Sequence, residues 1–117
     1  MLIGEATREQ LSGRIWTRAL GRFLLAGKSR PVSVHEVLGV DSPPAEELPW
    51  LTSFDAAVRG FTERRLDEAE EHFRQVIKLR GGQDGPSEFY LKQIASSRAI
   101  APSPEHPWDG IIVILSK

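Results

Sequence analysis

The chain has 117 residues, enough for one domain or two very small ones, and its 40% hydrophobic and 26% charged residues are ordinary for a folded globular protein. Its 15 basic and 16 acidic residues leave a formal net charge of -1, so no overall field favours nucleic acid or an anionic membrane as a partner. The absence of cysteine excludes disulfides and thiolate metal sites.

No segment has the pattern of a membrane anchor or of a secretion signal. The longest apolar run, Ile111–Leu115, is too short to span a bilayer, and the start of the chain lacks a basic segment followed by a long apolar one. We therefore expect a cytoplasmic protein, or the cytosolic part of a membrane-anchored one. We expect no nucleic-acid partner and no membrane contact by this segment.

The first third of the chain predicts strands, a short helix and a β-hairpin. In order, the pattern predicts a strand at Leu2–Ile3, a helix over Glu5–Leu11, a strand over Arg14–Leu25, a turn at Ala26–Arg30 and a strand from Pro31 to Leu38. Gly21 interrupts the long strand and indicates a bulge or a bend. Pro31 fits the first position of a strand, which need not donate a ladder hydrogen bond.

A linker is predicted from Gly39 to Pro49. Two adjacent prolines, Pro43 and Pro44, are incompatible with a helix or a central strand. We therefore place a domain boundary there, with a first region at 1–39, a Pro-rich linker at 40–49 and a second region at 50–117.

The second region predicts three helices and a closing strand. Apolar residues recur at helical spacing in two stripes, which are Leu51, Phe54, Ala57, Val58 and Phe61, and then Leu66, Ala69, Phe73, Val76 and Ile77. Gly81–Gly82 ends the second helix, and a third is expected over Ser87–Ile100 with Tyr90, Leu91, Ile94 and Ala95 facing inward. The β-branched run Ile111–Leu115 indicates a buried strand that adds to the sheet of the first region. The fold class is therefore α+β.

Several short motifs follow one another in the first 39 residues. They are Leu2-Ile3-Gly4-Glu5-Ala6-Thr7, Leu20-Gly21-Arg22, Gly27-Lys28, Pro31-Val32 and Glu36-Val37-Leu38-Gly39. In this order and spacing they resemble the strand, helix and closing hairpin of the catalytic domain of class III adenylate/guanylate cyclases. The resemblance implies a parent lyase that converts ATP, or GTP, to the cyclic nucleotide and pyrophosphate, with Mg or Mn as its metal, in signal transduction.

The same resemblance implies that this chain lacks the residues that catalyse the cyclisation. In the family, the metal-binding aspartates and the residues that steady the transition state lie upstream of this region, so we assign no catalytic residue, no metal site and no cofactor here. The first lysine of the family's Lys-Gly-Lys turn is Ala26, and an alanine cannot neutralise a phosphate. Lys28 is retained, and it lies either near the nucleotide phosphates or in solvent as an ordinary turn lysine.

The helical region resembles a tetratricopeptide hairpin through Phe61, Leu66, Ala69 and Phe73, although the usual turn glycine is Arg64 and the usual terminal proline is Gly81. Many bacterial cyclases carry, after the catalytic domain, a helical region that ends in a Trp-Asp-Gly strand and a lysine. Trp108-Asp109-Gly110, the following apolar strand and Lys117 are similar to that ending.

Other candidate sites have plainer interpretations. The histidines, His35, His72 and His106, are far apart with no metal-ligand spacing, and Glu68, Glu70 and Glu71 lie beside basic residues on one helix face. The large aromatic residues are expected to form packing or partner contacts, and they are Trp50, Phe54, Phe61, Phe73 and Trp108.

Two functions follow from these observations. The first is an inactive C-terminal regulatory or structural segment of a cyclase-like protein, which packs on an upstream catalytic domain, stabilises a homodimer or docks a partner. The alternative is a stand-alone helical module for protein–protein interaction. A small independent enzyme is disfavoured, because the sequence offers no nucleophile–base pair and no metal cluster.

Overall fold

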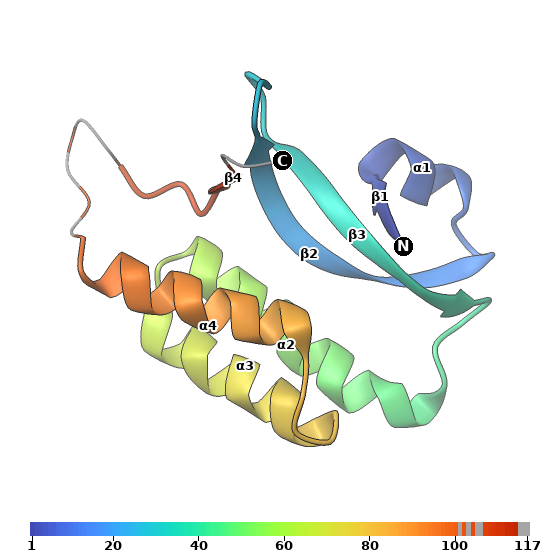
Figure 1. Cartoon of the computed structure of the whole chain (residues 1–117). Helices are drawn as coiled ribbons and strands as arrows, with labels where there is room; N and C mark the ends of the chain where they lie inside the picture. Colours follow the sequence, from blue (N-terminus) through green and yellow to red (C-terminus); the bar gives the residue numbers. More distant parts are fainter. Residues whose placement is uncertain (101, 103, 105–106, 115–117) are drawn as a thin grey trace. The chain divides into compact units, whose positions relative to one another are not determined.

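The structure is a computed structural model that describes residues 1–100, 102, 104 and 107–114. It confirms the α+β class and divides into two compact units (Figure 1). The first unit holds Met1–Glu47 together with the stretch that begins at Ile111, and the second holds Leu48–Gly110.

The first unit is a curved, mixed four-stranded sheet with one short helix. Its elements are β1 (Leu2–Gly4), α1 (Glu5–Gln10), β2 (Ile15–Leu25), β3 (Val32–Val40), the 3-10 turn η1 (Ala45–Glu47) and β4 (Ile112–Ile114). The strand order is β1-β3-β2-β4, with β1 and β2 antiparallel to β3 and with β4 parallel to β2. Figure 1 shows β2 and β3 as one long hairpin, with α1 beside β1.

Two features of the hairpin follow the sequence prediction. The pairing register of β2 and β3 shifts between Ala19 and Gly21, where Gly21 adopts a φ of 122°, so the predicted bend is present. At the tip, Gly27 also has a positive φ of 79°, and the amide of Lys28 donates to the carbonyl of Leu25 over 3.0 Å. Glycine fits both positions because it has no Cβ to clash there.

The predicted C-terminal strand does join the first unit's sheet. β4 pairs with Phe23–Leu25 of β2, although the described strand covers Ile112–Ile114, and Leu115 lies outside the described residues. The helical unit, Leu48–Gly110, lies between β3 and β4 in the sequence. The sheet is therefore completed by a strand that is distant in sequence.

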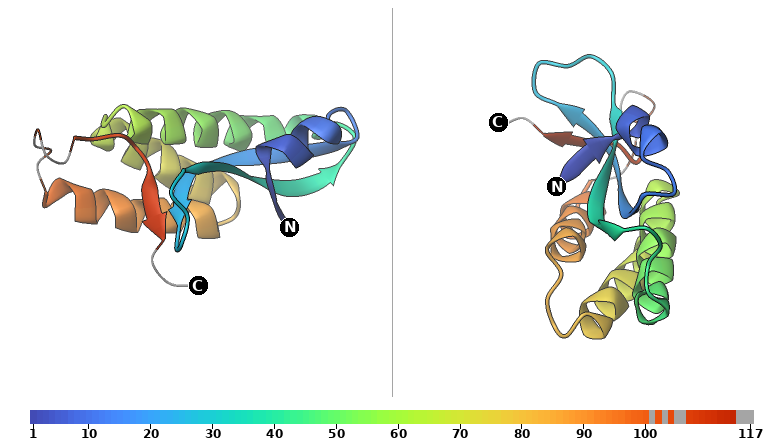
Figure 2. Two further views of the ribbon diagram at one scale, coloured as in Figure 1. Left: turned by 90° about the horizontal axis from the view of Figure 1, so that it is seen from above. Right: turned by 90° about the vertical axis from the view of Figure 1, so that its right-hand side faces the viewer.

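The second unit consists of α2 (Leu48–Thr62), α3 (Leu66–Leu79) and α4 (Gly85–Arg98). α3 packs against both α2 and α4, and Figure 2 shows the three helices as neighbours. The buried residues of α3 are Leu66, Ala69, Phe73 and Val76, which belong to the stripe predicted from the sequence. At the crossing of α2 and α3, Gly60 and Ala69 are both buried, and a Cβ on Gly60 would lie 3.5 Å from that of Ala69.

Element ends differ from the sequence prediction by a few residues. α2 begins at Leu48, which precedes the predicted stripe. Pro49 is compatible with this start because it lies in the first helical turn, where a backbone N–H has no intrahelical acceptor. α4 covers Gly85–Arg98 instead of Ser87–Ile100, since Asp84 caps it and Pro86 fits its first turn. Within α4, Tyr90 and Ile94 are buried as expected, whereas Ala95 is exposed.

An aromatic cluster fills the helical unit. The rings of Phe73 and Tyr90 stack with centroids 4.8 Å apart, while Phe54 and Phe61 meet Tyr90 edge-on at 6.4 and 5.0 Å. All four side chains are at most 3% exposed. Such pairs add stability beyond the apolar area that they remove from water.

Gly110 lies against Thr62 at the end of α2. Gly110 has a φ of 72°, and a Cβ there would lie 2.8 Å from the Cα of Thr62. We expect Gly110→Ala to lower the free energy of unfolding by about 2 kcal/mol, because it adds both backbone strain and a backbone clash. Urea denaturation followed by far-UV circular dichroism measures the loss.

Gly85→Ala is the matched control, because a Cβ added there would meet nothing within 4 Å and the backbone at Gly85 is helical. It should leave stability unchanged or raise it slightly. Equal effects of the two substitutions would contradict the close approach at Gly110.

Candidate functional site

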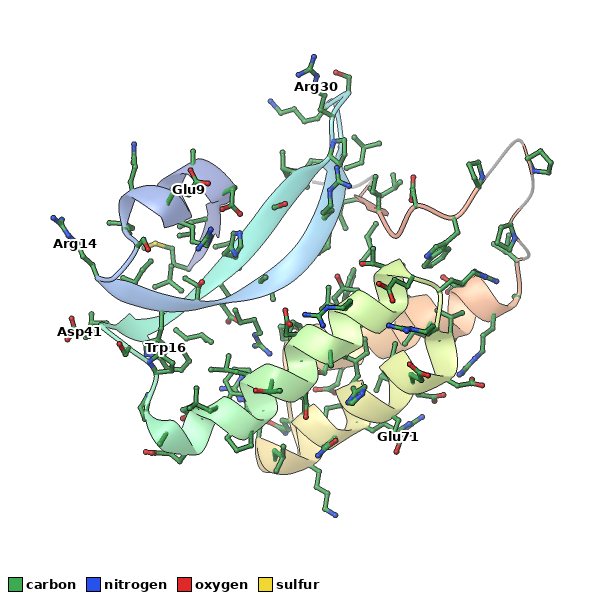
Figure 3. All side chains as sticks on the ribbon, turned by 180° about the vertical axis from the view of Figure 1, so that it is seen from behind. Glu9, Arg14, Trp16, Arg30, Asp41 and Glu71 are labelled. Atoms are coloured by element: carbon green, nitrogen blue, oxygen red, sulfur yellow. The ribbon has the colours of Figure 1, made fainter. Side chains whose placement is uncertain are left out.

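The turn that carries Lys28 is a cationic, open surface. Arg22, Lys28 and Arg30 are exposed, and no acidic residue occurs between Arg18 and Glu36 in the sequence. Figure 3 shows Arg30 at the free end of the hairpin, opposite the end where Arg14 and Asp41 lie. Within the described residues, no carboxylate forms an ion pair with these three cations, so they can attract an anion.

Two polar contacts fasten the first unit, and sequence reasoning missed both. Arg18 is 3% exposed and donates through Nε and Nη2 to Oε1 of Glu36, at 2.9 and 2.7 Å. On the same sheet, Nε2 of His35 lies 2.8 Å from Oε1 of Glu5, which joins α1 to β3. Hydrogen bonds from Arg8 and then from His35 hold the pKa of the Glu5 carboxyl below its usual value.

An arginine in the left-handed region ends α2. Arg64 has a φ of 59°, its amide donates to the carbonyl of Phe61, and the amide of Arg65 donates to that of Gly60. These two bonds form a Schellman ending, whose left-handed position is normally glycine. An arginine there costs roughly 1 kcal/mol relative to glycine.

The side chain of Arg64 lies over an aromatic ring. Its guanidinium carbon is 5.0 Å from the ring centroid of Trp108, and Nη2 donates to the carbonyls of Ser97 and Ile100 over 3.4 and 3.3 Å. Trp108 donates its indole N–H to the carbonyls of Phe61 and Thr62, at 3.1 and 2.8 Å. These contacts satisfy carbonyls at the C-terminal ends of α2 and α4.

A second arginine–tryptophan pair occupies another part of the helical unit. The guanidinium of Arg80 lies 4.2 Å from the ring centroid of Trp50, and Nη1 donates to Oδ1 of Asp84 over 3.0 Å. Asp84 is buried and also accepts from the amide and the hydroxyl of Ser87, at 3.2 and 2.5 Å. This arginine therefore has a carboxylate partner, and the group works as the N-terminal cap of α4.

An open cleft of about 290 Å³ adjoins the Arg64–Trp108 pair. Its lining combines one cation, an aromatic ring, an aliphatic side chain and polar groups, from Arg64, Gln93, Ser96, Ser97, Ile100, Pro102, Pro107 and Trp108. The volume is close to the lower end of small-ligand sites. We take this cleft, defined by Arg64, Ser97, Ile100 and Trp108, as the candidate functional site and name it the Arg64 cleft.

The predicted aromatic residues divide between the interior and this cleft. Trp50, Phe54, Phe61 and Phe73 are at most 3% exposed, so they are placed for packing rather than for direct contact with a partner. Trp108 is partly buried and lines the cleft. No sequence signal would have paired Arg64 with Trp108, because a lone arginine in a turn resembles any solvated charge.

The predicted histidines do not come together. His35 binds Glu5, whereas His72 lies on α3 with a buried Nδ1 that has no hydrogen-bond partner, and His106 is outside the described residues. In the described part of the chain, no three His, Asp or Glu side chains converge to hold a metal ion. Over the same part, no helix has the length and hydrophobicity to cross a membrane.

In comparisons with known proteins, no protein-family model, no curated protein and no solved structure matches the chain.

An ion-pair network joins α3 to α4. Nη2 of Arg98 donates to Oδ1 of Asp67 and Oε1 of Glu70, at 2.6 and 2.7 Å, while Arg74 donates to the other oxygen of Glu70. Hydrogen bonds from Arg74 and then from Arg98 lower the pKa of Glu70 from its usual 4.5. A carboxyl with a lowered pKa in the folded state stabilises the fold above its unfolded pKa, and this contribution is lost as pH falls through the folded value.

We therefore expect Glu70→Gln to flatten the dependence of unfolding free energy on pH between about pH 6 and pH 3. Urea titrations across that range, followed by circular dichroism, measure the slope. Glu71→Gln is the control, since Glu71 is exposed on the same helix and points away from it in Figure 3. Identical pH profiles for the two variants would contradict a stabilising role for the network.

Proposed function

We propose that this chain is the C-terminal regulatory or structural segment of a cytoplasmic adenylate- or guanylate-cyclase-like protein, and that it is inactive by itself. In this proposal the first unit is the closing edge of a nucleotide-cyclising domain, and the helical unit is a tetratricopeptide-like appendage. Its partners are the upstream catalytic domain and a second copy of the same protein. Magnesium or manganese belongs to the parent enzyme and not to this chain.

The thin core of the first unit is the observation that carries the proposal. Among its described apolar side chains, Leu20 and Ile112 are the buried ones, whereas Ile3, Ile15 and Val34 remain only half-buried. A small sheet with so little buried apolar surface is marginal as a self-standing domain. A sheet that continues into a larger catalytic domain would bury these residues.

The order of elements supports the same proposal. A strand, a short helix and a long hairpin occur at the residues on which the cyclase resemblance rests, with the bulge at Gly21 and with Lys28 in an exposed turn. Ala26 leaves that turn with one cation fewer than the family's pattern. Nucleotide binding by this chain alone is therefore not expected.

The proposal is tested with the 117-residue chain and with the protein expressed from its natural gene, including any codons upstream of Met1. We expect no saturable binding of ATP or GTP by the chain with Mn²⁺ in isothermal titration calorimetry, and formation of cyclic nucleotide by the longer protein. Saturable binding by the chain alone would overturn the proposal, as would a natural gene that encodes no cyclase region before Met1.

In the longer protein, Lys28→Ala distinguishes the two roles of that lysine. Loss of one cation near the phosphates would raise KM about threefold to tenfold with little change in kcat. Ser29→Ala in the same turn is the control. If the two variants have equal KM, Lys28 is an ordinary solvated turn residue.

The second candidate function is a stand-alone module for protein–protein interaction. The helical unit favours it, because its aromatic cluster is buried within the unit and its surface carries the Arg64 cleft. A natural gene that starts at Met1 would support this alternative.

A further inference from the structure

The two arginine–tryptophan pairs of the helical unit differ in one respect. Arg80 lies over Trp50 and has the carboxylate of Asp84 as its ion-pair partner. Arg64 lies over Trp108, and in the part of the chain that the structure describes its side chain donates to the carbonyls of Ser97 and Ile100, at 3.4 and 3.3 Å. Within the described residues, no carboxylate forms an ion pair with Arg64.

The guanidinium of Arg64 has N–H donors that its two carbonyl partners leave unused. A guanidinium has five N–H donors in a planar fork that matches a carboxylate, and the two long bonds to carbonyls use only Nη2. The backbone position of Arg64 also favours glycine, so the arginine is held there against a conformational preference. Residues kept in such backbone regions are often functional.

The lining of the cleft restricts the kind of anion. Trp108 and Ile100 supply apolar walls, while Ser97 and Gln93 supply hydrogen-bonding groups. Arg98, the last residue of α4, forms ion pairs with Asp67 and Glu70. Arg64 is the cation that lines the cleft, and the carboxylates of Asp67 and Glu70 already pair with Arg98. A single cation suits a singly charged group and disfavours a doubly charged phosphate.

We propose that the Arg64 cleft binds a carboxylate carried on an apolar group, with the carboxylate on the Arg64 guanidinium and the apolar part against Trp108 and Ile100. Two sources supply this chemistry, which are a small organic acid and the C-terminal carboxylate of a peptide. The inference rests on the helical unit alone and is independent of the proposed cyclase relationship.

The test is a titration of the full 15N-labelled chain, followed by ¹H–¹⁵N correlation spectra. The probes are 3-phenylpropanoate, the dipeptide acetyl-Ala-Leu with a free carboxylate, and the same dipeptide as its C-terminal amide. We expect saturable shifts of the Trp108 indole N–H and the Ser97 amide, with a dissociation constant of about 1 mM for a ligand this small. The Trp50 indole N–H is the control in the same spectra, because its arginine already has a carboxylate.

Binding of both acids supports the shared carboxylate chemistry, and binding of the peptide acid alone identifies a C-terminal peptide as the source. The proposal is overturned if neither acid shifts Trp108 up to about 10 mM, or if the peptide amide binds as tightly as the acid.

Two variants distinguish an effect of the Arg64 charge on binding from an effect on folding. Arg64→Gly removes the cation and suits the left-handed backbone, so it should keep the circular dichroism spectrum and weaken binding about tenfold or more. Arg64→Lys keeps the charge without the planar fork and should weaken binding less. Unchanged affinity in the folded Arg64→Gly variant would show that the cleft does not use this cation.

Discussion

The helical unit depends on Tyr90, whose ring joins all three helices. From α4 it stacks on Phe73 of α3 and meets Phe54 and Phe61 of α2. Burial raises the pKa of the Tyr90 phenol far above its usual value of 10.0, so this group stays neutral under ordinary conditions. Phe61 extends the cluster to Trp108 with centroids 5.0 Å apart, so the wall of the Arg64 cleft is attached to the core.

Periodicity and turn residues predicted the elements well because they are local signals. The stripes on α2 and α3, the Gly81–Gly82 ending, the bend at Gly21 and the joining of β4 to the sheet could be predicted from spacing and residue type alone. Errors at element ends came from Pro49 and Asp84, whose effects depend on where they fall in the first helical turn.

The polar sites could not be predicted, since they depend on long-range contacts. Arg18 reads as a surface charge in a strand, yet it is buried against Glu36. Arg64 and Trp108 are far apart in sequence and meet only after α2, α3 and α4 have packed. The left-handed position after a helix is usually a glycine, and no local signal in the sequence predicts that an arginine occupies it.

The interruption of the sheet by the helical unit has a consequence for folding. During synthesis β2 and β3 emerge before α2, α3 and α4, whereas β4 emerges after them. The β2–β4 pairing therefore closes a long chain loop, which slows its formation compared with the β2–β3 hairpin. On the ribosome, the Phe23–Leu25 edge of β2 stays open to other strands until β4 has been made.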